Sequence, residues 1–235
     1  MTPVLRRFHR DDSGISLTEM LVAMSVAMII VVAVGGFFAA TVRAGSTNTT
    51  SDANARNASI VLNSMTRYVH AASLLPKVDG SYASAVTQAG LTQLTFYAYI
   101  NLDGNSTDKP VQLRYSLNGS NRLVQDQWDG SAVNGFYSFP GTSQTPTRSA
   151  VIGGPIASPT SDGDPLFTYL GADGKALTTQ ADGTLASAQL SKVRAVRVNL
   201  ELGSATAGVP GSTHVQNTLY LFNVVYGTTT ETGTP

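Results

Sequence analysis

The chain has 235 residues, with 15 Lys and Arg against 15 Asp and Glu, so its formal net charge is zero. This balance argues against general nucleic-acid binding, which normally requires a basic face. The absence of cysteine excludes disulfides, thiolate metal sites and cysteine nucleophiles, and three histidines leave little material for acid–base catalysis. The composition therefore favours a structural or binding protein over an enzyme.

The N-terminal part of the chain combines a basic patch with a long apolar run. Three arginines lie within residues 1–10, and no charged residue occurs between Met20 and Val42. At about 1.5 Å per residue this run spans roughly 35 Å, enough to cross the hydrocarbon core of a bilayer. Basic residues before the run and a polar segment after it predict a single-pass protein of the cytoplasmic membrane, with its N-terminus inside the cell.

Glu19 is the one charge within the apolar stretch that begins at Ile15. A carboxylate at this depth costs about 2–3 kcal/mol unless it is paired. A position near the lipid headgroups would give Glu19 a purely interfacial role. The cost of an unpaired charge nevertheless makes Glu19 a candidate functional residue.

Residues 11–19 read Asp-Asp-Ser-Gly-Ile-Ser-Leu-Thr-Glu. This string resembles the class III signal of type IV prepilins and type II secretion pseudopilins. In that family a prepilin peptidase cuts after a glycine, leaving an apolar first residue, subject to N-terminal methylation, and a glutamate at the fifth position. Gly14, Ile15 and Glu19 match these three positions. The resemblance implies a removable leader over residues 1–14, a transmembrane and filament-core helix over residues 15–44, and subunit docking between Glu19 and the new amine of Ile15.

Two features of the segment depart from the family pattern. Ile15 replaces the more usual phenylalanine, and the proline that major pilins often carry maps to Gly36. Gly35 and Gly36 are expected to weaken the helix there through backbone freedom. A competing interpretation is a twin-arginine leader cut before Gly45, but the apolar run exceeds the roughly 7–15 residues typical of such leaders.

The polar residues 44–52 predict a loosened or broken helix. Helical periodicity then resumes, with four apolar residues on one face: Ala58, Leu62, Met65 and Val69. Pro76 is expected to end this helix, because the residue before a proline avoids helical angles. Residues 45–76 are therefore predicted to form a linker and an amphipathic second half of the helix, packed on a globular domain.

Residues 77–235 are predicted to form a β-rich globular domain. Alternating or apolar runs predict strands over residues 94–100, 111–117, 122–124, 165–170, 192–202 and 219–226, and Asn118-Gly119 predicts a hairpin turn. Residues 130–165 are expected to form a long loop with one short strand. The order predicts an α+β fold in which the helix packs on an antiparallel sheet. The strand pattern also resembles the body of minor pilins of the J type.

Oxygen-bearing side chains alternate in the turn after the first strand: Asn101, Asp103, Asn105 and Asp108. Calcium loops use such spacing. The bidentate glutamate that closes a calcium loop is missing, and Asx-rich turns form without metal because these side chains bond their own backbone. Residues 162–164 are likewise either a calcium site or a turn that forms without metal. We expect no other metal site and no cofactor.

Aromatic and histidine side chains are further candidates for a binding or catalytic site. Four tyrosines on strands either form a partner-binding patch or pack within the sheet: Tyr97, Tyr99, Tyr220 and Tyr226. A surface or packing role is expected for His70, which lies in the predicted helix near Tyr68, and no serine lies in a nucleophile-elbow motif.

The resemblance therefore implies a minor pilin or pseudopilin, a structural and assembly subunit of a type IV pilus or a type II secretion-like filament. Its expected partners are prepilin peptidase, other pilin subunits and the inner or cytoplasmic membrane, and its final place is an extracytoplasmic or cell-surface filament. Alternatives are a tip adhesin or DNA-uptake subunit, which would use the 130–165 loop or the aromatic strands, and a conventionally secreted surface domain.

Overall fold

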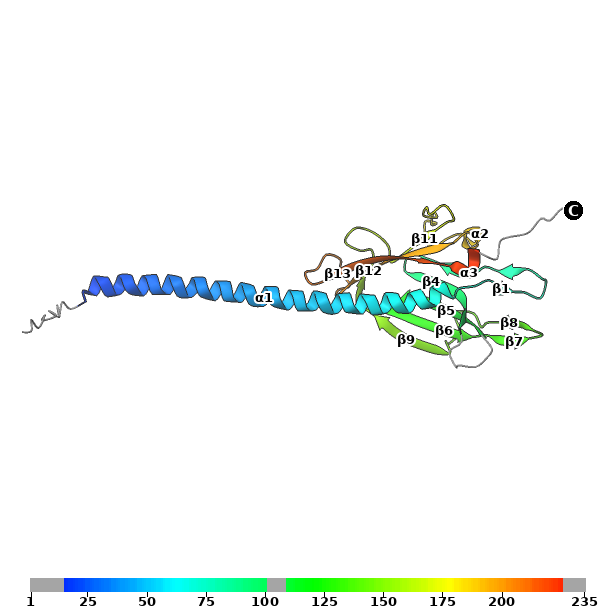
Figure 1. The fold of residues 1–235 in the computed structure, drawn as a ribbon, viewed down its shortest axis with the longest axis horizontal. Coiled ribbons are helices and arrows are strands. Elements are labelled where there is room, and N and C mark those ends of the chain that lie inside the picture. The colour runs from blue at the N-terminus through cyan, green and yellow to red at the C-terminus, as the bar shows by residue number, and fades with distance from the viewer. Residues whose placement is uncertain (1–14, 101–108, 226–235) are drawn as a thin grey trace, which may run out of the picture. The chain divides into compact units, whose positions relative to one another are not determined.

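The computed structural model describes residues 15–100 and 109–225. A long helix is followed by antiparallel sheets, so the predicted α+β class is confirmed (Figure 1). The chain divides into two compact units, Met1–Ser46 and Thr47–Pro235. The first contains only the N-terminal part of the helix among its described residues, and the second contains the rest of the helix and all described strands.

The helix α1 extends over Leu17–His70 without a break. The prediction of a loosened helix over residues 44–52 is therefore wrong, and Gly35 and Gly36 are also helical. Within the second unit, contacts made by β13 (Thr213–Tyr220) and the loop before it hold the polar stretch. Asn54 Nδ2 donates to the carbonyl of Gly211 at 2.8 Å, and Thr213 Oγ1 donates to the carbonyl of Ser51 at 3.0 Å. Such tertiary contacts override weak local helix propensity.

One face of α1 enters the core of the second unit. Its buried residues are Ala58, Val61, Leu62, Met65, Tyr68 and Val69. They include all four residues of the predicted apolar face, which is confirmed. The helix ends at His70, before the predicted end at Pro76, because Ala72 already pairs with Ala98 as an isolated bridge.

The first sheet has five antiparallel strands in the order β3-β4-β5-β6-β9. They are β3 (Val86–Ala89), β4 (Gln93–Ile100), β5 (Lys109–Leu117), β6 (Leu123–Asp129) and β9 (Arg148–Gly153). The predicted strands over 94–100 and 111–117 are confirmed as β4 and β5, in a register that places Phe96 opposite Leu113. The predicted hairpin turn joins β5 to β6, and Asn121 there adopts a positive φ of 53°.

The second sheet is built around β12 (Ala195–Leu202), which pairs with β13 (Thr213–Tyr220) on one side. On its other side are β10 (Ile156–Ala157) and β11 (Phe167–Leu170). The strands predicted over 165–170 and 192–202 are thus confirmed. The prediction of a last strand over residues 219–226 is wrong in its position. Strand β13 begins at Thr213, and residues Phe222–Val225 form the short helix α3. Another short helix, α2, covers Ser187–Leu190.

The predicted long loop over residues 130–165 is also wrong in part, because it contains four strands. Besides β9 and β10 it forms the hairpin of β7 (Ser131–Val133) and β8 (Phe136–Ser138). Shortly after α1, β1 (Leu75–Pro76) and β2 (Tyr82–Ala83) form a further two-stranded pair. Strands such as β9, whose residues are mostly exposed, arise from main-chain pairing with a neighbouring edge and carry little apolar alternation.

The helix and both sheets of the second unit share one hydrophobic core. The sheets are tied together where Phe167 N donates to the carbonyl of Leu91 at 3.0 Å. The hydroxyl of Tyr169 also reaches across and accepts a hydrogen bond from Gly90 N at 3.0 Å. The amphipathic half of α1 thus packs with both sheets around one core.

Candidate functional site

The candidate site lies at the beginning of α1, where Ser16 caps the helix. The carbonyl of Ser16 accepts hydrogen bonds from the backbone N–H groups of Glu19 and Met20 at 3.0 and 3.1 Å. Its Oγ accepts a further bond from Glu19 N at 3.2 Å and lies 2.6 Å from Thr18 Oγ1. This is the geometry of an N-cap, in which a side-chain oxygen satisfies one of the orphan N–H groups of the first turn.

The capping role of Ser16 was not foreseen from the sequence. The signal was present, because Ser16-Leu17-Thr18-Glu19 fits the pattern of a capping box. Glu19 also lies in the first turn, where the helix dipole stabilises a negative charge. A local structural role therefore accompanies any role of Glu19 in assembly.

Glu19 and Ile15 lie within one turn of each other, and both are exposed. Within residues 15–100 and 109–225, no ion pair or side-chain hydrogen bond engages the Glu19 carboxylate. Gly14, the third residue of the predicted processing motif, lies outside the described residues. The described part of the site thus consists of an exposed carboxylate one turn from the apolar residue Ile15.

The apolar surface that follows Glu19 is uncovered in the isolated chain. An 18-residue stretch of α1 has a mean hydropathy of 2.6, and none of it is buried. Among the described residues, α1 is the helix long and apolar enough to cross a membrane, although signal sequences and core helices of soluble proteins meet the same criterion. Exposed apolar area on this scale requires a lipid or protein partner in water.

The candidate calcium residues Asn101, Asp103, Asn105 and Asp108 all lie outside the described residues. In the described part of the chain, no group of three or more His, Asp or Glu side chains is placed to hold a metal. Asp162 instead faces His214, with Asp162 Oδ2 at 3.1 Å from His214 Nδ1. His214 lies in β13, and Asp162 lies in the loop between β10 and β11.

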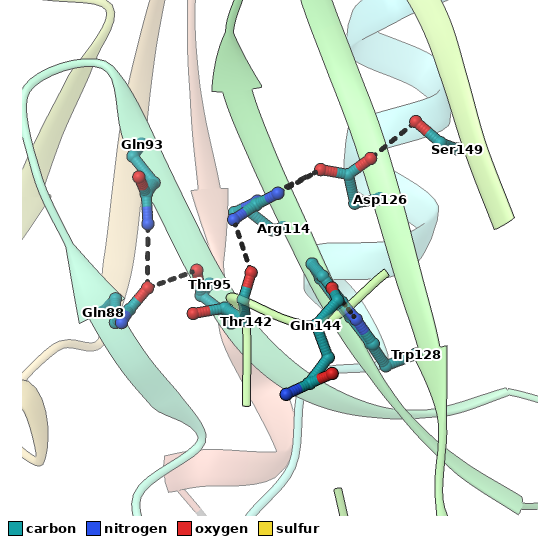
Figure 2. A network of polar contacts seen from close by, with 9 residues as sticks. All are labelled: Gln88, Gln93, Thr95, Arg114, Asp126, Trp128, Thr142, Gln144 and Ser149. Carbon is teal, nitrogen blue, oxygen red and sulfur yellow. Dashed lines mark hydrogen bonds and ion pairs between the residues drawn. The ribbon is translucent and has the colours of Figure 1, made fainter. Parts of the chain in front are cut away.

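A polar network covers part of the five-stranded sheet (Figure 2). Arg114 donates from Nε and Nη2 to Asp126 Oδ2 at 3.1 and 2.6 Å, and from Nη1 to the carbonyl of Thr142 at 3.0 Å. Trp128 Nε1 donates to the carbonyl of Gln144 at 3.0 Å. All three guanidinium nitrogens of Arg114 donate to protein acceptors, so the network fastens residues 142–144 to the sheet.

The predicted aromatic residues are dispersed over the second unit. Tyr97 is half-buried, with its ring centroid 5.0 Å from that of Phe139. Tyr220 is exposed, and its ring stacks on Phe222 at 6.2 Å. His70 packs edge-on against Phe222 at 4.7 Å, in keeping with the expected packing role. Tyr226 lies outside the described residues.

Comparisons with protein-family models, curated protein sequences and solved structures find no match to this chain. The function must therefore be argued from the residues themselves. The feature that distinguishes this chain is the exposed carboxylate at the beginning of a long, uncharged, apolar helix.

Proposed function

We propose that this protein is a minor subunit of a type IV pilus or a type II secretion-like pseudopilus. The observation that carries the proposal is Glu19, an exposed charge in the first turn of a helix that is otherwise uncharged from Met20 to Val42. In this proposal the protein is a structural and assembly component and not an enzyme. Its place near the filament tip follows only from the resemblance to J-type subunits.

In this proposal, the apolar surface of α1 lies first in the membrane and then in the filament. Before assembly, the helix would lie in the cytoplasmic membrane with its N-terminus inside the cell, as the basic residues of the leader favour. After assembly, the same side chains would pack against the helices of neighbouring subunits. Both environments exclude water from residues such as Leu21, Ile29 and Phe37, which are more than 60% exposed in the isolated chain.

Cleavage by prepilin peptidase would create a positively charged partner for the Glu19 carboxylate. Hydrolysis of the Gly14–Ile15 peptide bond by prepilin peptidase would leave a carboxylate on Gly14 and an amine on Ile15. When a subunit docks, its amine can meet the Glu19 carboxylate of a neighbour. Away from water, an unpaired charge is strongly penalised, so the ion pair would select one register of packing.

The first test is N-terminal sequencing and intact mass of the protein from a membrane fraction, with and without prepilin peptidase. A peptidase-dependent start at Ile15 is the expected result. A start at Gly45 would identify a conventionally exported domain and refute the proposal; such a cut would fall inside α1. An uncut chain in the presence of the peptidase would also refute processing.

The second test is the assembly of Glu19 variants in cells that make the filament. Glu19→Ala should be processed and inserted normally but should be lost from purified filaments by tenfold or more. Glu19→Asp should retain part of the incorporation because it keeps the charge. Thr18→Ala is the matched control from the same turn and should assemble like the wild type. Equal incorporation of Glu19→Ala and Thr18→Ala would refute the docking role.

A further inference from the structure

The first turns of α1 in the second unit are helical although their residues disfavour a helix. Residues 47–51 read Thr-Asn-Thr-Thr-Ser. Each of these residue types disfavours a helix about two- to threefold relative to alanine. Residues 47–50 are also exposed, so burial of apolar surface does not explain why they are helical. Another part of the chain must stabilise this segment.

The loop between β12 and β13, residues 203–212, lies against this part of the helix, and we name it the clasp loop. Its Gly211 carbonyl accepts a hydrogen bond from Asn54 Nδ2, and a Cβ built at Gly211 would lie 3.5 Å from Thr50 Cγ2. Just after the clasp loop, Thr213 Oγ1 donates to the Ser51 carbonyl. At its other end, Gly203 has a φ of 117°, which favours glycine, and a Cβ there would lie 2.5 Å from Asn54 Nδ2.

A buried carboxylate shapes the clasp loop. Glu201 is 1% exposed and lies in β12, immediately before the clasp loop. Its Oε1 accepts hydrogen bonds from Gly208 N at 2.6 Å and Ser212 Oγ at 3.1 Å, and its Oε2 accepts one from Ser161 N at 2.6 Å. The carboxylate therefore joins the loop that contains Ser161 to the clasp loop, and the clasp loop meets the helix.

We infer that the clasp loop is a releasable latch that controls whether residues 47–54 are helical. While the clasp loop is docked, its contacts offset the weak helix propensity of the segment. When it is displaced, the segment is released, and the chain lengthens by about 2 Å for every residue that becomes extended. The core face from Ala58 to Val69 stays packed, because it is held by both sheets.

The test is amide hydrogen exchange, read by mass spectrometry, on the full chain in detergent micelles. In Thr213→Val, exchange should rise about fivefold over residues 47–54, which is the effect of one net hydrogen bond on the opening equilibrium. In Asn54→Ala the rise should be only about twofold, because alanine also favours the helix at that position. Residues 58–69 should be unchanged. Asn63→Ala is the matched control, since Asn63 is an exposed asparagine on the same helix. It should leave exchange over residues 47–54 unchanged and should not raise exchange over residues 58–69, because alanine only favours the helix there.

A further substitution tests the cause of the release. Adding Asn48→Ala to Thr213→Val should restore protection by about two- to threefold, because alanine raises helix propensity at this exposed position. The inference is overturned if Thr213→Val leaves exchange over 47–54 unchanged, or if exchange rises equally over 58–69. Failure of the rescue would overturn it as well. None of these outcomes depends on processing at Gly14, so they are separate from a failure of the proposed function.

Discussion

Replacing Tyr169 with phenylalanine removes the hydroxyl that joins the two sheets. This hydroxyl accepts a hydrogen bond from Gly90 N at 3.0 Å and donates to one of two carbonyls, that of Gly90 at 2.9 Å or that of Gln93 at 2.7 Å. The residue is 1% exposed. Burial raises the pKa of Tyr169 far above its usual range, despite the opposing effect of the Gly90 hydrogen bond, so the hydroxyl is a donor at neutral pH.

The size of the expected loss in stability depends on the hydrogen bonds that the backbone groups of Gly90 and Gln93 keep after the substitution. Gly90 N also donates to the Gln93 carbonyl at 2.8 Å, and Gln93 N donates to the Gly90 carbonyl at 3.4 Å. Tyr169→Phe therefore removes two hydrogen bonds without leaving an unpaired backbone group. We expect the free energy of unfolding to fall by about 1–2 kcal/mol. For a unit of this size, the melting temperature should fall by about 2–8 °C.

The assay is urea and thermal unfolding of the full chain in detergent, followed by fluorescence of Trp128. Trp128 is the single tryptophan and is fully buried, so its emission reports unfolding of the domain. Tyr220→Phe, at an exposed position, is the control and should have no measurable effect. The reasoning is refuted if Tyr169→Phe behaves like the control. A loss above about 4 kcal/mol would also contradict it, because the backbone groups would then have lost their remaining partners.

Two further predictions use the same assay. Asp126→Ala should lower the free energy of unfolding by about 2–4 kcal/mol, because it leaves the Arg114 guanidinium without its carboxylate partner. The Arg114 side chain is 24% exposed, which keeps the cost below that of a fully buried pair. A loss below about 1 kcal/mol would contradict this prediction. For Glu201, burial raises the pKa, but hydrogen bonds from two backbone N–H groups outweigh it and hold the pKa below its usual value. This carboxylate should thus stabilise the fold above its unfolded pKa of about 4.3, and the stabilisation should be lost as the pH falls through the lower folded value. Glu201→Gln should be less stable than the wild type at pH 6, and the difference should shrink towards pH 3; a constant difference would show that ionisation of Glu201 is not involved.

Much of the fold was predictable because it depends on local periodicity. The face of α1 that carries Ala58, Leu62, Met65 and Val69 is buried, since apolar residues at helical spacing have one way to leave water. Strands β4 and β12 were predictable for a similar reason, because apolar residues recur at every second position along them, although burial in β12 does not alternate. The exposed charge of Glu19 on a bare apolar helix is likewise a direct property of the sequence.

Other elements could not be predicted, because their hydrogen bonds are made with distant segments. The polar stretch around Thr50 has the composition of a linker, yet it is helical beside a loop that lies more than 150 residues later in the chain. Strand β13 begins at Thr213 with polar residues and owes its position to pairing with β12. The 130–165 region contains β9 and β10 for the same reason.

The sequence by itself thus determined the apolar helix, its single early charge and the helical and strand periodicities, because each depends on residue type and spacing along the chain. Tertiary structure alone decided where α1 remains helical, which edges the short strands join, and how the Glu201 carboxylate holds the clasp loop. These features depend on backbone groups that every residue carries, and their partners are chosen only when the sheets meet in space.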